Sequence, residues 1–119
     1  MTRDDVQRWL DRYVEAWRTC EPEAIASLFA EDATYAYQPW AEPLQGGEAI
    51  VADWLREPDP PGTWQASYRP LLIDGDVAIA TGETRYSDGK RYENLFVIEL
   101  DESGRCRRFV EWYMRHPKS

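Results

Sequence analysis

The sequence predicts a single α+β domain, spanning residues 1–119, in which three helices precede an antiparallel sheet. Up to residue 56, apolar side chains recur every three or four positions, which is typical of amphipathic helices. Beyond residue 62, four extended runs are separated by short turns, two of which contain Asp-Gly. A chain of 119 residues is long enough to bury a substantial core.

The first helix is expected at Asp4–Arg18, with Thr2 and Asp4 as candidate N-terminal caps. Its apolar stripe consists of Val6, Leu10, Tyr13, Val14 and Trp17. A second, shorter helix opens at Glu21-Pro22, because proline is tolerated in a first turn, where its missing N–H would have no partner. The apolar face of this helix is expected to comprise Ile25, Leu28 and Phe29.

A short strand is expected at Ala33–Tyr37, and the segment Gln38–Gly47 is expected to be a loop because it contains two prolines and two glycines. A third helix follows at Glu48–Arg56, and the proline-rich linker Pro58–Gly62 ends it. The apolar side of this helix is formed by Ile50, Val51, Trp54 and Leu55.

The last half of the chain is predicted to be strand and turn. Asp-Gly between two extended runs favours a hairpin, because type I′ turns need residues that tolerate positive φ. The turns are placed at Asp74-Gly75, Asp88-Gly89 and Asp101–Gly104. They join four strands in a meander, at Trp64–Ile73, Val77–Tyr86, Arg91–Leu100 and Arg105–Met114.

Charge argues against a nucleic-acid partner. The net charge is −8, and the basic cluster Arg105, Arg107 and Arg108 alternates in direction along its strand, so it does not form one face. No apolar run has the length of a membrane span or signal peptide. We therefore expect neither a nucleic-acid nor a membrane partner, and a cytoplasmic protein.

The scarcity of cysteine and histidine argues against two kinds of functional site. Cys20 and Cys106 have no CxxC partner, and His116 is the one histidine. A zinc site and a catalytic unit built on histidine are therefore not expected. We predict no metal and no organic cofactor.

Three local motifs carry a resemblance to a known family. They are Arg12-Tyr-Val-Glu-Ala, then Ala26-Ser-Leu-Phe-Ala-Glu-Asp-Ala-Thr34, then Gly47-Glu-Ala-Ile50. With the order of elements, they make nearly the whole chain similar to the nuclear transport factor 2-like superfamily, which includes SnoaL-like polyketide cyclases and ketosteroid isomerases. The resemblance implies a cone: a curved antiparallel sheet wraps around the helices and leaves an interior, mostly apolar pocket. It also implies a homodimer formed through the convex face of the sheet.

The resemblance carries over to this sequence only in part. Tyr13 falls where ketosteroid isomerases have a tyrosine that stabilises an oxyanion, although plain packing of Tyr13 is an alternative. Tyr37 falls where those enzymes have their aspartate base, and a phenol is a poor base at neutral pH. Their second oxyanion-hole acid falls near Asn94 or Phe96. Steroid-type isomerisation by the same residues is therefore not expected, although Asn94 could orient a carbonyl or a water.

Alternation along the last strand points to a different carboxylate. Phe109, Glu111 and Tyr113 share one face, which the family alignment turns inward. Burial there would raise the pKa of Glu111 and suit it to proton transfer. The alternatives are a salt bridge with an arginine or a position at the wet mouth of the cone.

These residues give a functional hypothesis. Glu111 would move a proton, while Tyr13 and Asn94 hold an oxygen of a small lipophilic substrate in isomerase, cyclase or hydrolase chemistry. The alternatives are a non-catalytic domain that binds a small apolar ligand and a dimerising accessory module. The pocket is expected to be lined by Tyr13, Tyr35 or Tyr37, Trp40, Trp54, Tyr92, Asn94, Phe109, Glu111 and Tyr113.

Overall fold

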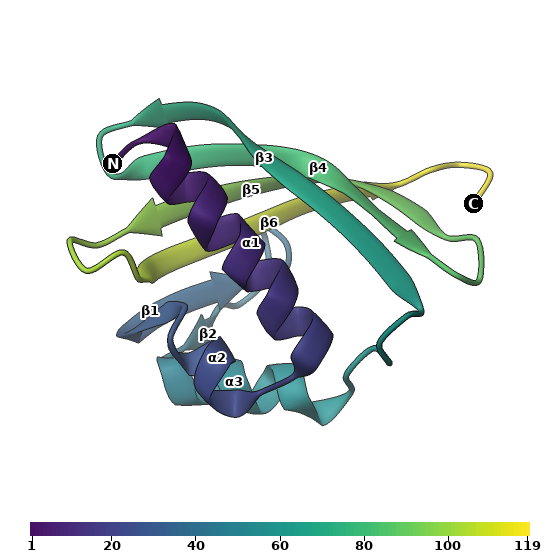
Figure 1. Cartoon of the computed structure of the whole chain (residues 1–119), viewed down its shortest axis with the longest axis horizontal. Helices are drawn as coiled ribbons and strands as arrows, with labels where there is room; N and C mark the ends of the chain where they lie inside the picture. The colour runs from purple at the N-terminus through teal and green to yellow at the C-terminus, as the bar shows by residue number, and fades with distance from the viewer.

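A computed structural model describes all residues, 1–119, as three helices and one curved sheet (Figure 1). The helix α1 lies across the sheet, while α2 and α3 lie together with β1 and β2 at one side of it. None of the helices is long and apolar enough to cross a membrane. In chain order the elements are α1 (Arg3–Thr19), α2 (Pro22–Ala26), β1 (Phe29–Ala36), β2 (Leu44–Gln45), α3 (Gly47–Arg56), β3 (Trp64–Asp74), β4 (Val77–Tyr86), β5 (Arg91–Leu100) and β6 (Cys106–Arg115).

The sheet has the strand order β2-β1-β6-β5-β4-β3. Strands β3 to β6 form the antiparallel meander expected from the sequence, and β2 also pairs antiparallel with β1. The pairing of β1 with β6 is parallel, with Tyr35 opposite Phe109. The α+β cone is therefore confirmed, with a mixed sheet in place of the purely antiparallel one that was expected.

The helix α1 is set by its cap and its apolar stripe. The Thr2 hydroxyl accepts a hydrogen bond from the Asp5 backbone N–H, and the Asp5 carboxylate accepts one from the Thr2 N–H, which forms a capping box. The helix ends at Cys20, whose φ of 54° lies in the left-handed region. The buried stripe consists of Val6, Trp9, Leu10, Tyr13 and Ala16.

The start of β1 corrects the sequence prediction. Leu28 and Phe29 were expected on the apolar face of the second helix, but α2 ends at Ala26 and β1 begins at Phe29. The Leu28 carbonyl accepts hydrogen bonds from the Cys106 backbone N–H at 2.7 Å and from Trp9 Nε1 at 3.0 Å. Docking against β6 and α1 thus draws this segment into the sheet instead of the helix.

The core fills one end of the cone. Its largest side chains come from α1, β1, β5 and β6, and their rings pack against one another: the ring centroids of Phe96 and Phe109 are 4.8 Å apart, and those of Trp9 and Phe29 are 6.0 Å apart. These four side chains are at most 2% exposed. The interior of the other end is where the candidate site lies.

Candidate functional site

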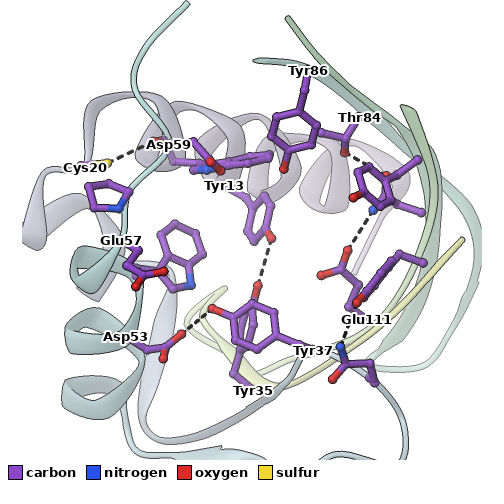
Figure 2. A pocket seen from close by; sticks show the side chains of 17 residues that line it. Tyr13, Cys20, Tyr35, Tyr37, Asp53, Glu57, Asp59, Thr84, Tyr86 and Glu111 are labelled. Atoms are coloured by element: carbon purple, nitrogen blue, oxygen red, sulfur yellow. Dashed lines mark hydrogen bonds between the residues drawn. The ribbon is translucent and has the colours of Figure 1, made fainter. Parts of the chain in front are cut away.

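A cavity of about 370 Å³ opens at the end of the cone away from this core (Figure 2). Its walls come from the C-terminal part of α1, from the end of β1 and the two residues after it, from α3 and the three residues that follow it, and from strands β4, β5 and β6. The lining residues are Tyr13, Trp17, Cys20, Tyr35, Tyr37, Gln38, Asp53, Trp54, Glu57, Pro58, Asp59, Thr84, Tyr86, Tyr92, Asn94, Glu111 and Tyr113.

Strand alternation places the β-sheet residues of the pocket. Tyr92 and Asn94 on β5, like Glu111 and Tyr113 on β6, are two positions apart and therefore point to the same face. Asn94 is opposite Tyr113 in the register, so Glu111 is its diagonal neighbour. The predicted inward face of both strands thus forms one wall of the cavity.

The Glu111 carboxylate faces the cavity without a basic partner (Figure 2). Asn94 Nδ2 donates a hydrogen bond to Glu111 Oε2 at 2.8 Å. Burial raises the pKa of Glu111 to about 7, and the hydrogen bond from Asn94 acts in the opposite direction. Neither a salt bridge to an arginine nor a fully wet position describes this side chain. The carboxyl can therefore gain or lose a proton near neutral pH.

A chain of hydrogen bonds fixes the orientation of Asn94. The Thr84 hydroxyl donates to Asn94 Oδ1 at 2.9 Å and lies 2.6 Å from the Tyr68 hydroxyl. Because Thr84 uses its one proton on Asn94, Tyr68 must donate to Thr84. The amide oxygen is therefore occupied by Thr84, and the amide nitrogen is left to face Glu111.

A second polar pair is formed by Tyr13 and Tyr35. Their hydroxyl oxygens are 3.0 Å apart, and both side chains are at most 6% exposed. Burial raises the pKa of both phenols well above the usual value, so both stay protonated at neutral pH. Each hydroxyl carries one proton, and only one is needed for the bond between them. The other is available to an oxygen atom of a ligand.

A third pair joins Tyr37, the residue after β1, to α3. The Tyr37 hydroxyl donates to Asp53 Oδ2 at 2.5 Å, and Asp53 Oδ1 is 3.1 Å from Arg56. Burial and the hydrogen bond to Asp53 raise the pKa of Tyr37 well above its usual value. Tyr37 is thus a proton donor to Asp53 and not a base, which agrees with the sequence expectation that it replaces the usual aspartate without its chemistry.

Most of the residues predicted for the pocket do lie in it: Tyr13, Tyr35, Tyr37, Trp54, Tyr92, Asn94, Glu111 and Tyr113. Two predictions are wrong. Trp40 is 82% exposed and lies on the outer side of the sheet with Trp112 and Met114, because the turn that carries it points away from the cavity. Phe109 is 0% exposed and packs behind Tyr13 and Tyr35, with ring centroids 5.5 and 4.5 Å away. It belongs to the core.

The sequence did not reveal the rim of the pocket. Pro58 and Asp59 were assigned to a linker, Glu57 to no element, and Trp17 to the apolar stripe of the first helix. The position of Asp53, three residues after the buried Ile50 and beside Trp54 on α3, was the one signal that it faces inward. No group of three or more His, Cys, Asp or Glu side chains is placed to hold a metal ion.

A comparison with protein families identifies the family of this chain. The model of the SnoaL-like domain matches residues 10–115. The chain belongs to the SnoaL-like domain family. The resemblance to the nuclear transport factor 2-like superfamily is thereby confirmed, although no curated protein matches the sequence.

Solved structures share the SnoaL-like fold at low sequence identity. A provisionally named ketosteroid isomerase from Kribbella flavida is 21% identical with a TM-score of 0.73, and the match covers 94% of this chain and 79% of that one. A protein of unknown function from Burkholderia xenovorans is 16% identical with a TM-score of 0.72, covering 92% and 83%. Another from Mesorhizobium loti is 16% identical with a TM-score of 0.72, covering 94% and 93%. At these identities the likeness establishes the fold alone.

Proposed function

We propose that this SnoaL-like domain is a small-molecule enzyme in which Glu111 transfers a proton on a lipophilic substrate, without a metal or organic cofactor. The observation that carries the proposal is a carboxyl that has no basic partner, faces an aromatic cavity and has a pKa raised to about 7 by burial. A general acid or base is most effective when its pKa is close to the working pH. Isomerase, cyclase and hydrolase chemistry all use such a group.

An isomerisation illustrates how the residues would act. Deprotonated Glu111 takes a proton from a carbon next to a carbonyl, and the electron pair of the broken C–H bond moves onto the carbonyl oxygen. The free hydroxyl proton of the Tyr13–Tyr35 pair donates a hydrogen bond to that oxygen. Glu111 then returns the proton to a different carbon, which restores the carbonyl.

We assign Asn94 a positioning role in this scheme. It was expected to hold an oxygen of the substrate; its amide oxygen accepts from Thr84, and its amide nitrogen donates one of its two protons to Glu111. Its contribution is therefore to fix the rotamer of the carboxyl and to moderate its pKa.

A general probe of proton abstraction tests the proposal without a known substrate. The ring of 5-nitrobenzisoxazole opens when a base removes its one acidic C–H, the N–O bond breaks and a coloured phenolate is released. We expect the wild-type protein to catalyse this reaction with a rate that rises with pH through about 7. Glu111→Gln should lower the rate about a hundredfold, while Glu102→Gln, an exposed carboxylate in the β5–β6 turn, should not change it. Equal rates for wild type and Glu111→Gln would contradict the proposal.

Ligand binding without turnover is the second candidate, and the aromatic walls favour it. Eight of the lining residues are tyrosine or tryptophan, and these bind apolar ligands whatever the state of Glu111. Tight binding of a lipophilic ligand in both wild type and Glu111→Gln, with no turnover in a ketone, ester and epoxide screen, would favour this candidate.

We also propose that the domain is a homodimer that pairs through the convex face of the sheet. On that face Trp112 is 53% exposed and Met114 is 74% exposed, and Leu95 lies opposite Trp112 in the register. Exposed apolar side chains on one face favour an association surface. The double variant Trp112→Glu/Met114→Glu should be a monomer by light scattering where the wild type is a dimer, and a monomeric wild type would contradict this proposal.

The cytoplasm remains the predicted location. Cys20 and Cys106 are not joined to each other, which suits a reducing compartment. Fractionation of the producing cell is the test.

A further inference from the structure

We propose that the ligand of this pocket carries a cationic nitrogen, as an amine or a quaternary ammonium group, attached to an apolar body. The inference rests on the proposed function only in using the same pocket. It narrows the class of ligand from lipophilic molecules in general to lipophilic cations.

The lining of the cavity is acidic. Four carboxylates line the cavity, and none of its 17 lining residues is Lys, Arg or His. An anionic ligand would be repelled from such walls, whereas a cationic one would be attracted to them. Two of the four, Asp53 and Glu111, come from α3 and β6, and the other two, Glu57 and Asp59, lie at the rim.

Three of these carboxylates have no countercharge from the protein. Asp53 is paired with Arg56 and accepts a hydrogen bond from Tyr37. Glu111 accepts only the hydrogen bond from Asn94. Glu57 and Asp59 make neither an ion pair nor a side-chain hydrogen bond. Glu57 is exposed at the rim, and Asp59 is only partly exposed. A bound cation would supply the missing charge.

Aromatic rings line two opposite walls of the cavity. Tyr86, Tyr92 and Tyr113 stand in a row on β4, β5 and β6, with successive ring centroids 5.8 Å apart and rings nearly perpendicular. The opposite wall has Trp17, which is stacked on Trp64 at 3.7 Å, and Trp54. Rings that meet at steep angles present both faces and edges to the space between them. Faces of tyrosine and tryptophan attract cations, tryptophan most strongly.

The carboxylates and the rings occupy the same part of the pocket. Burial first, and then the nearby negative charge of Asp59, raise the pKa of Tyr86 to about 12. Figure 2 shows Asp59, Tyr86 and Glu111 arranged around the same open space. A cationic headgroup placed there meets ring faces and carboxylates together, which is the combination that selects quaternary ammonium ions over neutral groups of the same shape.

The test compares two molecules of the same shape and different charge. Benzyltrimethylammonium and neopentylbenzene differ only in a positively charged nitrogen replaced by carbon. Binding to the full-length protein is measured by calorimetry at about pH 8, where Glu111 is mostly ionised. We expect the cation to bind about tenfold or more tightly than its neutral counterpart. Equal affinity, tighter binding of neopentylbenzene, or no binding of the cation at millimolar concentration would overturn the inference.

Variants at the rim test whether Glu57 and Asp59 cause the tighter binding of the cation. Glu57→Gln/Asp59→Asn should weaken binding of the cation about fivefold and leave neopentylbenzene unchanged. The control, Asp74→Asn/Glu102→Gln, removes the same net charge from exposed turns at the opposite end of the strands, and should leave both affinities unchanged. An equal loss in the control and the rim variant would show a non-specific effect of net charge and overturn the inference.

The outcome is separable from that of the proposed function. Selective binding of the cation together with equal benzisoxazole rates for wild type and Glu111→Gln would leave the ligand class standing and remove the enzyme. Glu111-dependent benzisoxazole opening without cation selectivity would support the proposed enzyme and contradict the proposed ligand class.

Discussion

The two ends of the cone are built from the same elements and differ in what those elements turn inward. Along β5 and β6 the inward side chains are apolar at one end, and they become polar two residues further on, at Asn94 and at Glu111. The helix α1 changes in the same way, from Trp9 in the core to Tyr13 at the edge of the pocket. Strand alternation therefore decides which face a residue occupies, whereas the change from apolar to polar side chains marks where the core ends and the site begins.

The boundary between the two ends is a layer of hydrogen bonds. It contains the Tyr13–Tyr35 pair and the chain from Tyr68 through Thr84 and Asn94 to Glu111. Buried polar groups of this kind need partners, and here they provide them for one another. The layer thus satisfies the polar groups between the packed core and the pocket, where burial raises the pKa of the Glu111 carboxyl.

The largest effect is expected in the closed end. Phe109→Ala removes a ring that is 0% exposed and contacts Tyr13, Tyr35 and Phe96. It should lower the free energy of unfolding by about 3–5 kcal/mol, because a cavity remains where the ring was. Urea denaturation followed by tryptophan fluorescence measures this, and a loss under about 1 kcal/mol would contradict the placement of Phe109 in the core.

The second-largest effect is a gain in the free energy of unfolding, expected when Glu111 is replaced. Its pKa is raised from 4.5 to about 7 on folding, so the folded state binds the proton more tightly and the wild type loses stability as pH rises between these values. Above about pH 7 the loss is on the order of 3 kcal/mol. Glu111→Gln has the same shape, keeps the acceptor for Asn94 and does not ionise.

The comparison of the two proteins therefore depends on pH. Glu111→Gln should be more stable than wild type above pH 7 and equal to it below about pH 4.5, measured by urea denaturation across this range. The other titrating carboxylates are common to both proteins and cancel in the difference. A difference that does not change with pH would mean that burial does not disfavour the charged form of Glu111.

Asn94→Ala should have a smaller effect on stability and a distinct effect on titration. It leaves the Thr84 hydroxyl without its acceptor, which should lower the free energy of unfolding by about 1–2 kcal/mol. It also removes the hydrogen bond that lowers the pKa of Glu111, so the midpoint of the pH–rate profile should move upward. A purely structural role for Asn94 would lower stability without moving the midpoint.

The smallest effect is expected at the mouth of the pocket. Tyr113 is 46% exposed, and its hydroxyl accepts a hydrogen bond from Gln38 at 3.0 Å. Tyr113→Phe should change the free energy of unfolding by less than about 0.5 kcal/mol, because water replaces the lost partner. A loss as large as that of Phe109→Ala would remove the distinction between the two ends.

The features that depend on local pattern could be predicted from the sequence. The period of the apolar stripe located α1, and the turn signals located β4, β5 and β6. The inward faces of β5 and β6 include Asn94 and Glu111, respectively. The carboxylate that faces the pocket was found by parity together with the family alignment, because adjacent residues of a strand point to opposite faces.

The features that depend on contacts between distant parts of the chain could not be predicted from the sequence. The parallel pairing of β1 with β6 joins Phe29 to Cys106, and nothing near Phe29 in the sequence indicates that a strand begins there. Asp53 becomes part of the site only because α3 packs beside Tyr37. Trp40 was placed at the pocket because it lies in the loop after the first strand, while its position is decided by the direction of a turn.

Direct titration of the Glu111 side chain tests the proton-transfer site most closely. The carboxyl carbon is followed by ¹³C NMR in protein labelled at glutamate, and Glu111→Gln assigns the signal by its absence. A midpoint at about 7 is predicted. A midpoint near the ordinary value of 4.5 would mean that the carboxyl is solvated and would contradict its role as the proton carrier.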